Sequence, residues 1–295
     1  MKVVLIGSTG FVGKNIAEKL KDKVELISTS RVQESFNYTY FDFTKPSSWD
    51  AIVKINPDII INAAAYGVVK SEIELKEMYD INYFLPRLFY EYLMKEACNT
   101  YWLQIGTAFE YDLSIIGGIT ETHPCVPQTH YGISKLQFSN YLLSKANNST
   151  YSILRPFGMF GKYEDGSKFF PMLIKAQKFK NPVELSHGNQ ERDYFLIDDL
   201  VFFISEILDS NKLKDLPNIL NLGSGKSYSF KFMANYIADK IPNFDSTLWE
   251  WGKLPLRLGE STQFFNSSSL AETLGFKISS LEVGFEEIVK YYYTS

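Results

Sequence analysis

The 295-residue sequence contains few cysteines, no excess of basic residues and no long apolar run. Its two cysteines, Cys98 and Cys125, fit no metal-ligand spacing and cannot form a disulfide framework, which favours a reduced, cytoplasmic compartment. Thirty Lys and Arg against 34 Asp and Glu give a net charge of −4, so no nucleic-acid partner is expected. The three histidines show no metal-ligand spacing, so no metal is expected. No stretch approaches the ~20 apolar residues of a membrane span, and the N-terminal apolar run, which ends at Gly7, is too short for a signal peptide.

The sequence does contain an alternation of short β-branched runs with amphipathic stretches of helix length. This pattern is typical of βαβ units around a parallel sheet. The expected strands are Lys2–Ile6, Val24–Ser28, Asp58–Ile61, Tyr101–Ile105 and Ser152–Leu154, and the expected helices are Phe11–Leu20, Glu72–Ala97 interrupted at Pro86, and Tyr131–Ala146. The predicted fold class is α/β, with a doubly wound parallel Rossmann sheet and a smaller, interleaved C-terminal lobe.

The pattern loosens after Gly161, and this change predicts the domain division. We expect residues 1–160 to form the dinucleotide-binding domain, with strands near 194–198 and 218–223 joining its sheet. Residues 161–190 and 226–295 are expected to form the lobe that binds the substrate. Helices are expected at Phe170–Phe179, from Asp198, at Phe230–Ile241 and at Val283–Tyr293.

A glycine-rich segment, residues 7–13 (GSTGFVG), lies between the first expected strand and the first expected helix. In this context Gly7 permits a tight turn, Gly10 lets the backbone approach a pyrophosphate, and Gly13 permits close packing of helix on strand. The N–H groups at the start of the helix would then face the phosphates. The segment predicts a dinucleotide site, although its spacing departs from the usual G-x-G-x-x-G.

The end of the second strand indicates which dinucleotide is bound. An NAD site places an acid there to bind the ribose hydroxyls, whereas this chain has residues 28–31 (STSR). Because a guanidinium pairs well with a 2′-phosphate, Arg31 favours NADP(H) as the cofactor and leaves NAD(H) possible.

Tyr131 and Lys135 are four residues apart on an expected helix, so they share one face of it. A nearby cation favours the phenolate and would lower the tyrosine pKa toward neutrality. Thr107 follows the strand Tyr101–Ile105, where its hydroxyl could bind a substrate oxygen beside Tyr131. The three side chains together predict proton transfer.

Thr107, Tyr131 and Lys135, downstream of the glycine-rich segment, resemble the Ser/Thr–Tyr–Lys set of the extended short-chain dehydrogenase/reductases, the NAD-dependent epimerase/dehydratase family. The resemblance runs over nearly the whole chain. The other segments that carry it are Asp42-Phe43, Ala63–Ala65, Asn82, the P-x-x-x-Y-G-x-S-K pattern from Pro127 to Lys135, Arg155–Phe157, Gly188–Tyr194, Asp198–Leu200, Asn221–Gly225 and Arg257–Glu260.

The resemblance implies roles for individual residues. Tyr131 would exchange a proton with the substrate, Lys135 would hold the nicotinamide ribose, and Thr107 would orient the reacting oxygen. The implied cofactor-binding residues are Gly7, Thr9, Gly10, Phe11, Val12, Gly13, Ser30, Arg31, Asp42, Phe43, Ala63, Ala64, Ala65, Asn82, Tyr131, Lys135, Arg155, Pro156 and Phe157. The implied substrate-binding residues are Tyr66, Thr107, Ala108, Phe109, Gly158, Phe169, Phe170, Arg192 and Arg257.

Among the implied substrate residues, Arg192 and Arg257 would bind the diphosphate of a nucleotide sugar, a task suited to guanidinium groups. Phe169 and Phe170 would either flank the nucleobase or belong to the core. Gly158 stands where many relatives carry an Asn, so this contact to the sugar or diphosphate is missing.

The departures from the family pattern narrow the reaction. Dehydratases carry an acidic pair directly after the catalytic Thr, but here Ala108 and Phe109 follow Thr107, and neither can transfer a proton. Enzymes that epimerise C3 and C5 before reducing C4 need a Cys at the position of Phe109 and a His near residues 164–166, where Ser167 and Lys168 stand instead. Both reactions are therefore disfavoured.

Three hypotheses remain. The first is NADPH-dependent reduction of the C4 ketone of a dTDP-, CDP- or GDP-linked 4-keto-6-deoxyhexose, for surface polysaccharides such as the lipopolysaccharide O-antigen. The second is an NAD-dependent 4-epimerase of the UDP-galactose type, and the third is a non-catalytic NADP-binding regulator on the same fold. Arg31 favours the reductase. Related enzymes dimerise through two helices, so a homodimer through Glu72–Ala97 and Tyr131–Ala146 is expected.

Overall fold

The computed structural model describes residues 1–295 except 33–36, 70, 97–98, 113, 115, 146–149, 211, 256–262 and 295. The chain divides into two compact units. Unit 1 comprises residues 1–111, 125–156 and 201–220, and unit 2 comprises residues 112–124, 157–200 and 221–295. Residues 112–124, expected in the dinucleotide-binding domain, belong instead to unit 2, because their strand pairs there with a strand from the C-terminal part of the chain.

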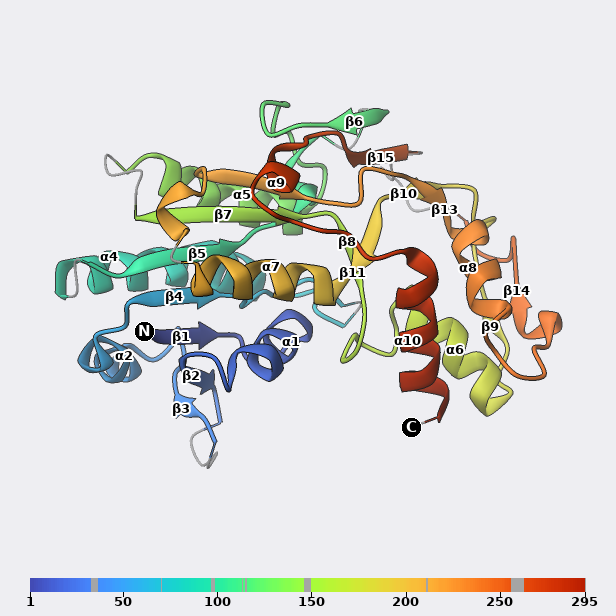
Figure 1. Ribbon diagram of the computed structural model, residues 1–295, viewed down its shortest axis with the longest axis horizontal. Helices are drawn as coiled ribbons and strands as arrows, with labels where there is room; N and C mark the ends of the chain where they lie inside the picture. Colours follow the sequence, from blue (N-terminus) through green and yellow to red (C-terminus); the bar gives the residue numbers. More distant parts are fainter. Residues whose placement is uncertain are drawn as a thin grey trace. The chain divides into compact units, whose positions relative to one another are not determined.

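Unit 1 is built around a seven-stranded sheet with the order β12-β7-β5-β4-β1-β2-β3 (Figure 1). Its strands are β1 (Lys2–Ile6), β2 (Glu25–Ser30), β3 (Thr39–Tyr40), β4 (Ile59–Asn62), β5 (Tyr101–Ile105), β7 (Tyr151–Pro156) and β12 (Ile219–Leu222). The ladders from β7 across to β3 are parallel, which confirms the predicted α/β fold with a doubly wound parallel sheet. The strand order reverses between β1 and β4, and such sheets bind ligands at the carboxyl ends of the strands at that point.

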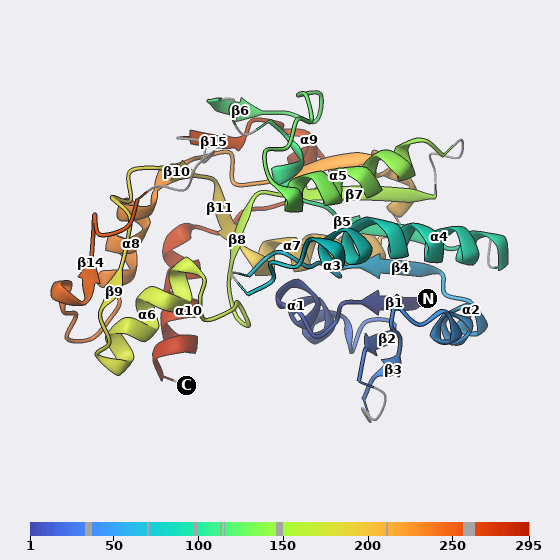
Figure 2. The same ribbon diagram turned by 180° about the vertical axis from the view of Figure 1, so that it is seen from behind.

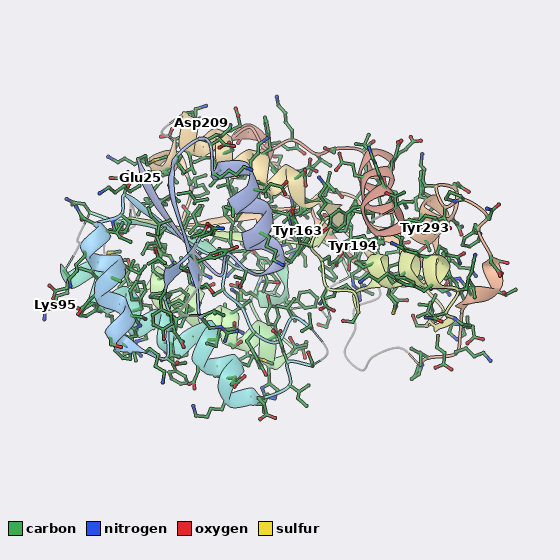
Figure 3. All side chains as sticks on the ribbon, turned by 90° about the horizontal axis from the view of Figure 1, so that it is seen from below. Glu25, Lys95, Tyr163, Tyr194, Asp209 and Tyr293 are labelled. Atoms are coloured by element: carbon green, nitrogen blue, oxygen red, sulfur yellow. The ribbon has the colours of Figure 1, made fainter. Side chains whose placement is uncertain are left out.

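Helices cover both faces of this sheet (Figures 1 and 2). They are α1 (Phe11–Leu20), α2 (Trp49–Ile55), α4 (Leu85–Glu96), α5 (His130–Leu143) and α7 (Ile197–Asp209). α1 and α7 share one face, where Lys23, just after α1, pairs with Asp209 at 2.8 Å (Asp209 is labelled in Figure 3). α4 contacts both α2 and α5 on the other face. Much of the aromatic content of unit 1 lies under this second layer, where Phe89 and Phe138 pack against Trp102 of β5.

The helix predicted over residues 72–97 forms three consecutive segments. They are α3 (Leu75–Tyr79), the π-helical segment η2 (Asp80–Phe84) and α4. The interruption predicted at Pro86 takes the form of the π-helical segment η2, and the helix continues through Pro86 as α4. Because Pro86 has no N–H and its ring would clash with the carbonyl of Asn82 in a regular helix, the preceding turn widens.

In the part of unit 2 that the structure describes, short strands form small sheets with the orders β13-β10-β15-β6, β11-β8 and β14-β9. They are β6 (Gly117–Ile119), β8 (Gly158–Phe160), β9 (Val183–Glu184), β10 (Glu191–Arg192), β11 (Tyr194–Leu196), β13 (Tyr228–Ser229), β14 (Trp249–Glu250) and β15 (Gln263–Asn266). The expectation that the strand near 194–198 joins the large sheet was wrong. β11 pairs with β8, because Gly158 lies so close that a Cβ on it would be 2.7 Å from the Asp193 carbonyl oxygen.

The core of unit 2 lies between helices rather than on a large sheet. α6 (Phe169–Phe179), α8 (Phe230–Ala238) and α10 (Leu281–Thr294) contact one another. Phe170 packs between Phe160 and Phe285, with ring centroids 5.2 and 5.3 Å away. None of the helices in the described residues is both long enough and apolar enough to cross a membrane.

Candidate active site

The glycine-rich segment forms a tight turn between β1 and α1, at the point where the strand order reverses. Gly7 has a φ of 80°, and a Cβ on it would come within 2.6 Å of the backbone nitrogen of Ala64. A Cβ on Gly13 would come within 2.1 Å of the carbonyl oxygen of Gly7. Both positions therefore require glycine. Because these two residues carry no side chain, a ligand such as the pyrophosphate of a dinucleotide can come close to the main chain of the turn.

The start of α1 adds donors to this turn. The first bond of the helix runs from the N–H of Lys14 to the oxygen of Gly10, at 2.9 Å. The N–H groups of Phe11, Val12 and Gly13 precede that bond and point out of the helix. Such N–H groups and the helix dipole bind anions, so these residues fit the pyrophosphate. Thr9 is exposed beside them.

The expected adenosine end of the site lies after β2 and β3. Ser30 is buried at the end of β2, and Arg31, which follows it, is exposed. The Asp42 carboxylate accepts the N–H and the hydroxyl of Thr44, both at 2.9 Å, and thus stabilises a turn. Phe43 belongs to the aromatic core, so its side chain does not face a ligand. Arg31 and Asp42 are the predicted side chains that stay at this surface.

The loop after β4 is fixed to α5 by Asn82. The Asn82 oxygen accepts the N–H of Tyr66 at 2.9 Å, and its nitrogen donates to the Tyr66 carbonyl at 2.8 Å and to the Ser134 hydroxyl at 3.0 Å. Ser134 in turn donates to the Tyr131 carbonyl at 2.8 Å. Asn82, which was expected to contact the cofactor, uses its amide to join residues 63–66 to the helix that carries Tyr131.

Thr107 and Tyr131 come together at the end of β5. Thr107 is the N-cap of a short 3₁₀ turn, η3 (Ala108–Glu110), and Tyr131 lies in the first turn of α5. A Cβ on Gly132 would lie 2.2 Å from the Phe109 carbonyl oxygen, so only glycine lets α5 approach this turn. The Tyr131 phenol then lies within hydrogen-bonding reach of the Thr107 hydroxyl. The predicted pair is therefore in place.

Lys135 does not act on Tyr131 as predicted. Its ammonium is buried and donates to the Ile105 carbonyl at 2.7 Å. Burial lowers the pKa of Lys135 to about 8. The pKa of Tyr131 is raised, first by burial and then by the Glu110 carboxylate, and not lowered. The expectation of a depressed tyrosine pKa was wrong for this structure, because the lysine charge is held on a carbonyl instead of on the phenol.

A buried ion pair beneath this site was not found by the sequence reasoning. Glu110 and Arg155 are 0% and 1% exposed, and their side chains are joined by two hydrogen bonds of 2.9 Å. Arg155, Pro156 and Phe157 are all buried, so a cofactor contact by the Arg155 side chain, as predicted, is not available. The T-x-x-E spacing from Thr107 to Glu110 is a helix-capping signature and could have identified Glu110.

Of the predicted substrate residues of unit 2, Phe170 lies in the core, whereas Phe169 and Arg192 each pack on an aromatic ring. Phe170 is fully buried in the core, which is one of the two roles predicted for it, so its side chain offers no surface for a nucleobase. Phe157, predicted to contact the cofactor, packs on Phe264 with ring centroids 5.8 Å apart. Phe169 is partly exposed and packs on Phe230 at 4.6 Å. Arg192 stacks on the same Phe264 ring at 5.0 Å and donates to the Glu191 carbonyl at 2.7 Å.

Arg257, the other predicted diphosphate ligand, lies outside the described residues. The buried carboxylate of Asp193, beside Arg192, was also missed. It accepts the N–H of Ser224 at 2.7 Å and the N–H of Asn266 at 3.0 Å. Asp193 thereby holds the glycine-rich residues 223–225 against β15.

Comparisons with known proteins agree with this architecture. CDP-abequose synthase of Yersinia pseudotuberculosis is 27% identical over 219 residues, covering 72% of this chain and 74% of that protein. GDP-6-deoxy-D-talose 4-dehydrogenase of Aggregatibacter actinomycetemcomitans is 24% identical, with coverage of 78% and 76%. The crystal structure of UDP-glucose 4-epimerase from Thermotoga maritima with UDP-glucose has a TM-score of 0.86 at 19% identity, over 100% and 99% of the two chains.

The family assignment follows from the sequence profile. The profile of the NAD dependent epimerase/dehydratase family matches residues 3–223, which include the glycine turn, Thr107, Tyr131 and Lys135. The sheet order, and the placement of the glycine turn after β1 and of Thr107 after β5, are those expected of such a chain. The protein belongs to the NAD dependent epimerase/dehydratase family.

Proposed function

We propose that this protein reduces the C4 ketone of a nucleoside-diphosphate 4-keto-6-deoxyhexose to the alcohol, using NADPH. Two relatives support a nucleotide-sugar substrate, since one is named for a CDP-linked sugar and the other for the C4 dehydrogenation of a GDP-linked deoxysugar. The observation that carries the proposal is the Tyr131 phenol beside Thr107, with inert Ala108 and Phe109 next to them. Tyr131 is then the proton donor, and the product would be an activated deoxysugar for surface polysaccharides.

The proposed step balances as one hydride and one proton added to a ketone. NADPH, bound at the β1–α1 turn, would supply the hydride to C4 of the sugar. Thr107 would donate a hydrogen bond to the ketone oxygen, and Tyr131 would transfer its proton to that oxygen. The raised pKa of Tyr131 supports this direction, because it keeps the phenol protonated before the reaction. Arg31, exposed after β2, supports NADPH over NADH.

A 4-epimerase is the second candidate. The fold shared with a UDP-glucose 4-epimerase favours it, as does the lack of an acidic pair after Thr107. In that reaction Tyr131 would first accept the proton of the C4 hydroxyl and later return it. A raised phenol pKa disfavours the first of these steps.

One assay separates the two candidates. The protein is mixed with NADPH and a panel of dTDP-, CDP- and GDP-linked 4-keto-6-deoxyhexoses, and the absorbance of reduced nicotinamide is followed. We expect stoichiometric oxidation of NADPH with at least one of them. Interconversion of UDP-sugars without added NADPH, and no oxidation with any ketone, would replace the reductase with the epimerase. Binding of NADPH with neither activity would favour a regulator.

We also propose a homodimer through α4 and α5. Phe84 and Leu88, one turn apart, are 47% and 48% exposed, and Leu143 on α5 is 37% exposed. Large apolar side chains gathered on two contacting helices are typical of a protein interface. Light scattering should give twice the chain mass, and Leu88→Asp should shift it to one chain mass while leaving the far-ultraviolet dichroism unchanged.

A further inference from the structure

The candidate proton-transfer site rests on a carboxylate that the proposed chemistry does not itself use. Glu110, the last residue of η3, has no exposed surface. One of its oxygens, Oε1, accepts the N–H of Thr107 at 3.1 Å. The other, Oε2, accepts the Nε and Nη2 groups of Arg155, both at 2.9 Å. Glu110 therefore connects the main chain at Thr107 to a side chain of strand β7.

The turn is shaped so that the two residues cap each other. The Thr107 hydroxyl accepts the N–H of Phe109 at 3.2 Å, while Glu110 accepts the N–H of Thr107, which is a complete capping box. Since the oxygen of the hydroxyl is already an acceptor there, its hydrogen is directed elsewhere, toward Tyr131 or a substrate oxygen. Gly106 makes this possible, because a Cβ on it would lie 2.7 Å from Oε1 of Glu110.

A buried ion pair at this place needs a reason other than stability. Removing two charges from water is costly, and an apolar pair of similar volume is often as stable. The pair nonetheless lies directly beneath the side chains of the proton transfer. The Glu110 carboxylate adds to the burial that raises the pKa of Tyr131, and it opposes the burial that lowers the pKa of Lys135. Glu110 therefore holds the main chain of Thr107 by a hydrogen bond, and its charge contributes to the pKa of Tyr131 and of Lys135.

We propose that Glu110, held in place by Arg155, is a positioning residue that fixes Thr107 so that its hydroxyl faces Tyr131 and the substrate oxygen. The inference rests on the proposed reduction. The negative charge of Glu110 adds to the effect of burial, which is the larger cause of the raised pKa of Tyr131. The charged and titratable groups that act on Tyr131 and Lys135 are Glu110 and Glu72, and those next to Arg155 are Glu110, Tyr111 and Cys125.

The decisive variant is Glu110→Gln, which keeps an oxygen for the Thr107 N–H and removes the charge. We expect kcat to fall about 10- to 100-fold, with the KM for NADPH within about threefold of the wild type. The alkaline limb of the kcat–pH profile should move to lower pH, because the carboxylate no longer raises the pKa of Tyr131 and Lys135. A fall in kcat that matches the folded fraction, with an unmoved limb, would overturn the proposal.

Two further variants guard against an effect of stability alone. Glu110→Gln with Arg155→Gln leaves no unpaired charge, and it should show the same shift of the alkaline limb as Glu110→Gln. Asp199→Asn is the matched control. Asp199 is a 6% exposed carboxylate that accepts the N–H and hydroxyl of Ser279 at 3.1 and 2.6 Å in unit 2. Its loss should lower the melting temperature without moving the pH profile.

A second measurement does not depend on the reaction. Hydrogen–deuterium exchange of the peptide covering residues 106–111 should be faster in the Glu110→Leu variant with Arg155→Leu than in the wild type, and unchanged in Asp199→Asn. If the wild type reduces no ketone but this exchange difference is present, the proposed function fails and the positioning of Thr107 stands. If the wild type is active and exchange is equal in all three proteins, the positioning role fails alone.

Discussion

Two glutamates with a buried carboxylate oxygen, Glu110 in unit 1 and Glu164 in unit 2, lie in different surroundings. Glu110 in unit 1 lies against the Arg155 guanidinium, with two bonds of 2.9 Å. Glu164 in unit 2 is mostly buried, and among the described residues its Oε2 has no hydrogen-bond partner. Burial raises the pKa of Glu164 to about 8. A partner keeps a buried carboxylate charged, and without one the acid is neutral instead.

The difference matters because the paired glutamate, Glu110, accepts the N–H of Thr107, a residue of the candidate site. The candidate site in unit 1 combines one buried ion pair, Glu110–Arg155, with a phenol, Tyr131, whose pKa is raised first by burial. Glu164 follows β8 at the end of a loop in which the Tyr292 hydroxyl donates to the Glu164 carbonyl at 3.1 Å. Its neutral acid therefore influences how unit 2 folds with pH. The four predictions below test where charge is needed and where it is not.

The largest effect is expected at the neutral phenol itself. Tyr131→Phe should lower kcat by about 10²- to 10⁴-fold, because it removes the proton donor and leaves the binding surface. The Kd for NADPH, measured by fluorescence titration, should stay within about twofold of the wild type. Tyr79→Phe is the control, since Tyr79 is bonded to His130 at 3.1 Å and takes no part in the proposed step. Full activity of Tyr131→Phe would remove Tyr131 from the mechanism.

The second prediction removes the ion-pair partner of Glu110, so that its carboxylate is buried without a partner, as Oε2 of Glu164 is among the described residues. Arg155→Met leaves the Glu110 carboxylate buried and unpaired, and should lower the free energy of unfolding by about 3–5 kcal/mol, as measured by urea denaturation at neutral pH. Most of this loss should be restored in the double variant Arg155→Met with Glu110→Leu. If the double variant is no more stable than Arg155→Met, the unpaired charge is not the cause.

The third effect concerns an exposed charge. Arg31→Ala should raise the KM for NADPH about tenfold and change the KM for NADH little, because only NADPH has a 2′-phosphate for the guanidinium to pair with. Lys21→Ala, another exposed cation of unit 1, is the control and should change neither value. Equal changes for both nucleotides would show that Arg31 does not select the phosphate.

The smallest effect is expected at Glu164. A folded-state pKa of about 8, above the ordinary value of 4.5 for a glutamate, means that the folded protein holds a proton that the unfolded chain releases. The contribution of Glu164 to the free energy of unfolding is complete below the pKa that this group has in the unfolded chain. It decreases as the pH rises toward about 8. Glu164→Gln should therefore lose about 2–4 °C less in melting temperature than the wild type between about pH 5 and about pH 9.

The control for this comparison is Glu184→Gln, an exposed glutamate of the same unit. It should follow the wild type at every pH. A Glu164→Gln variant that loses as much melting temperature as the wild type would mean that Glu164 is ionised in the folded protein.

Much of unit 1 could be predicted because its pattern is local. β1 and α1 have the predicted bounds, Lys2–Ile6 and Phe11–Leu20, since a buried strand and an amphipathic helix each leave a periodic signal in a short window. Several of the expected site residues of unit 1 follow the carboxyl ends of such strands, among them Gly7, Arg31 and Thr107. The strands of unit 2 could not be predicted in the same way, because a strand of two or three residues is too short to show an alternating hydrophobic pattern. The pairing of Phe264 with Gly117 joins segments far apart in the sequence.

The sequence by itself determined the doubly wound sheet, the glycine turn and the presence of Thr107, Tyr131 and Lys135, because each depends on residue type at fixed spacing. The tertiary structure alone decided how these groups are charged. In the folded chain the Lys135 ammonium donates a hydrogen bond to the Ile105 carbonyl, and the Glu110 carboxylate, paired with Arg155, accepts the N–H of Thr107. A pKa depends on burial and on neighbours brought together across strands, and no spacing along one strand or helix records them.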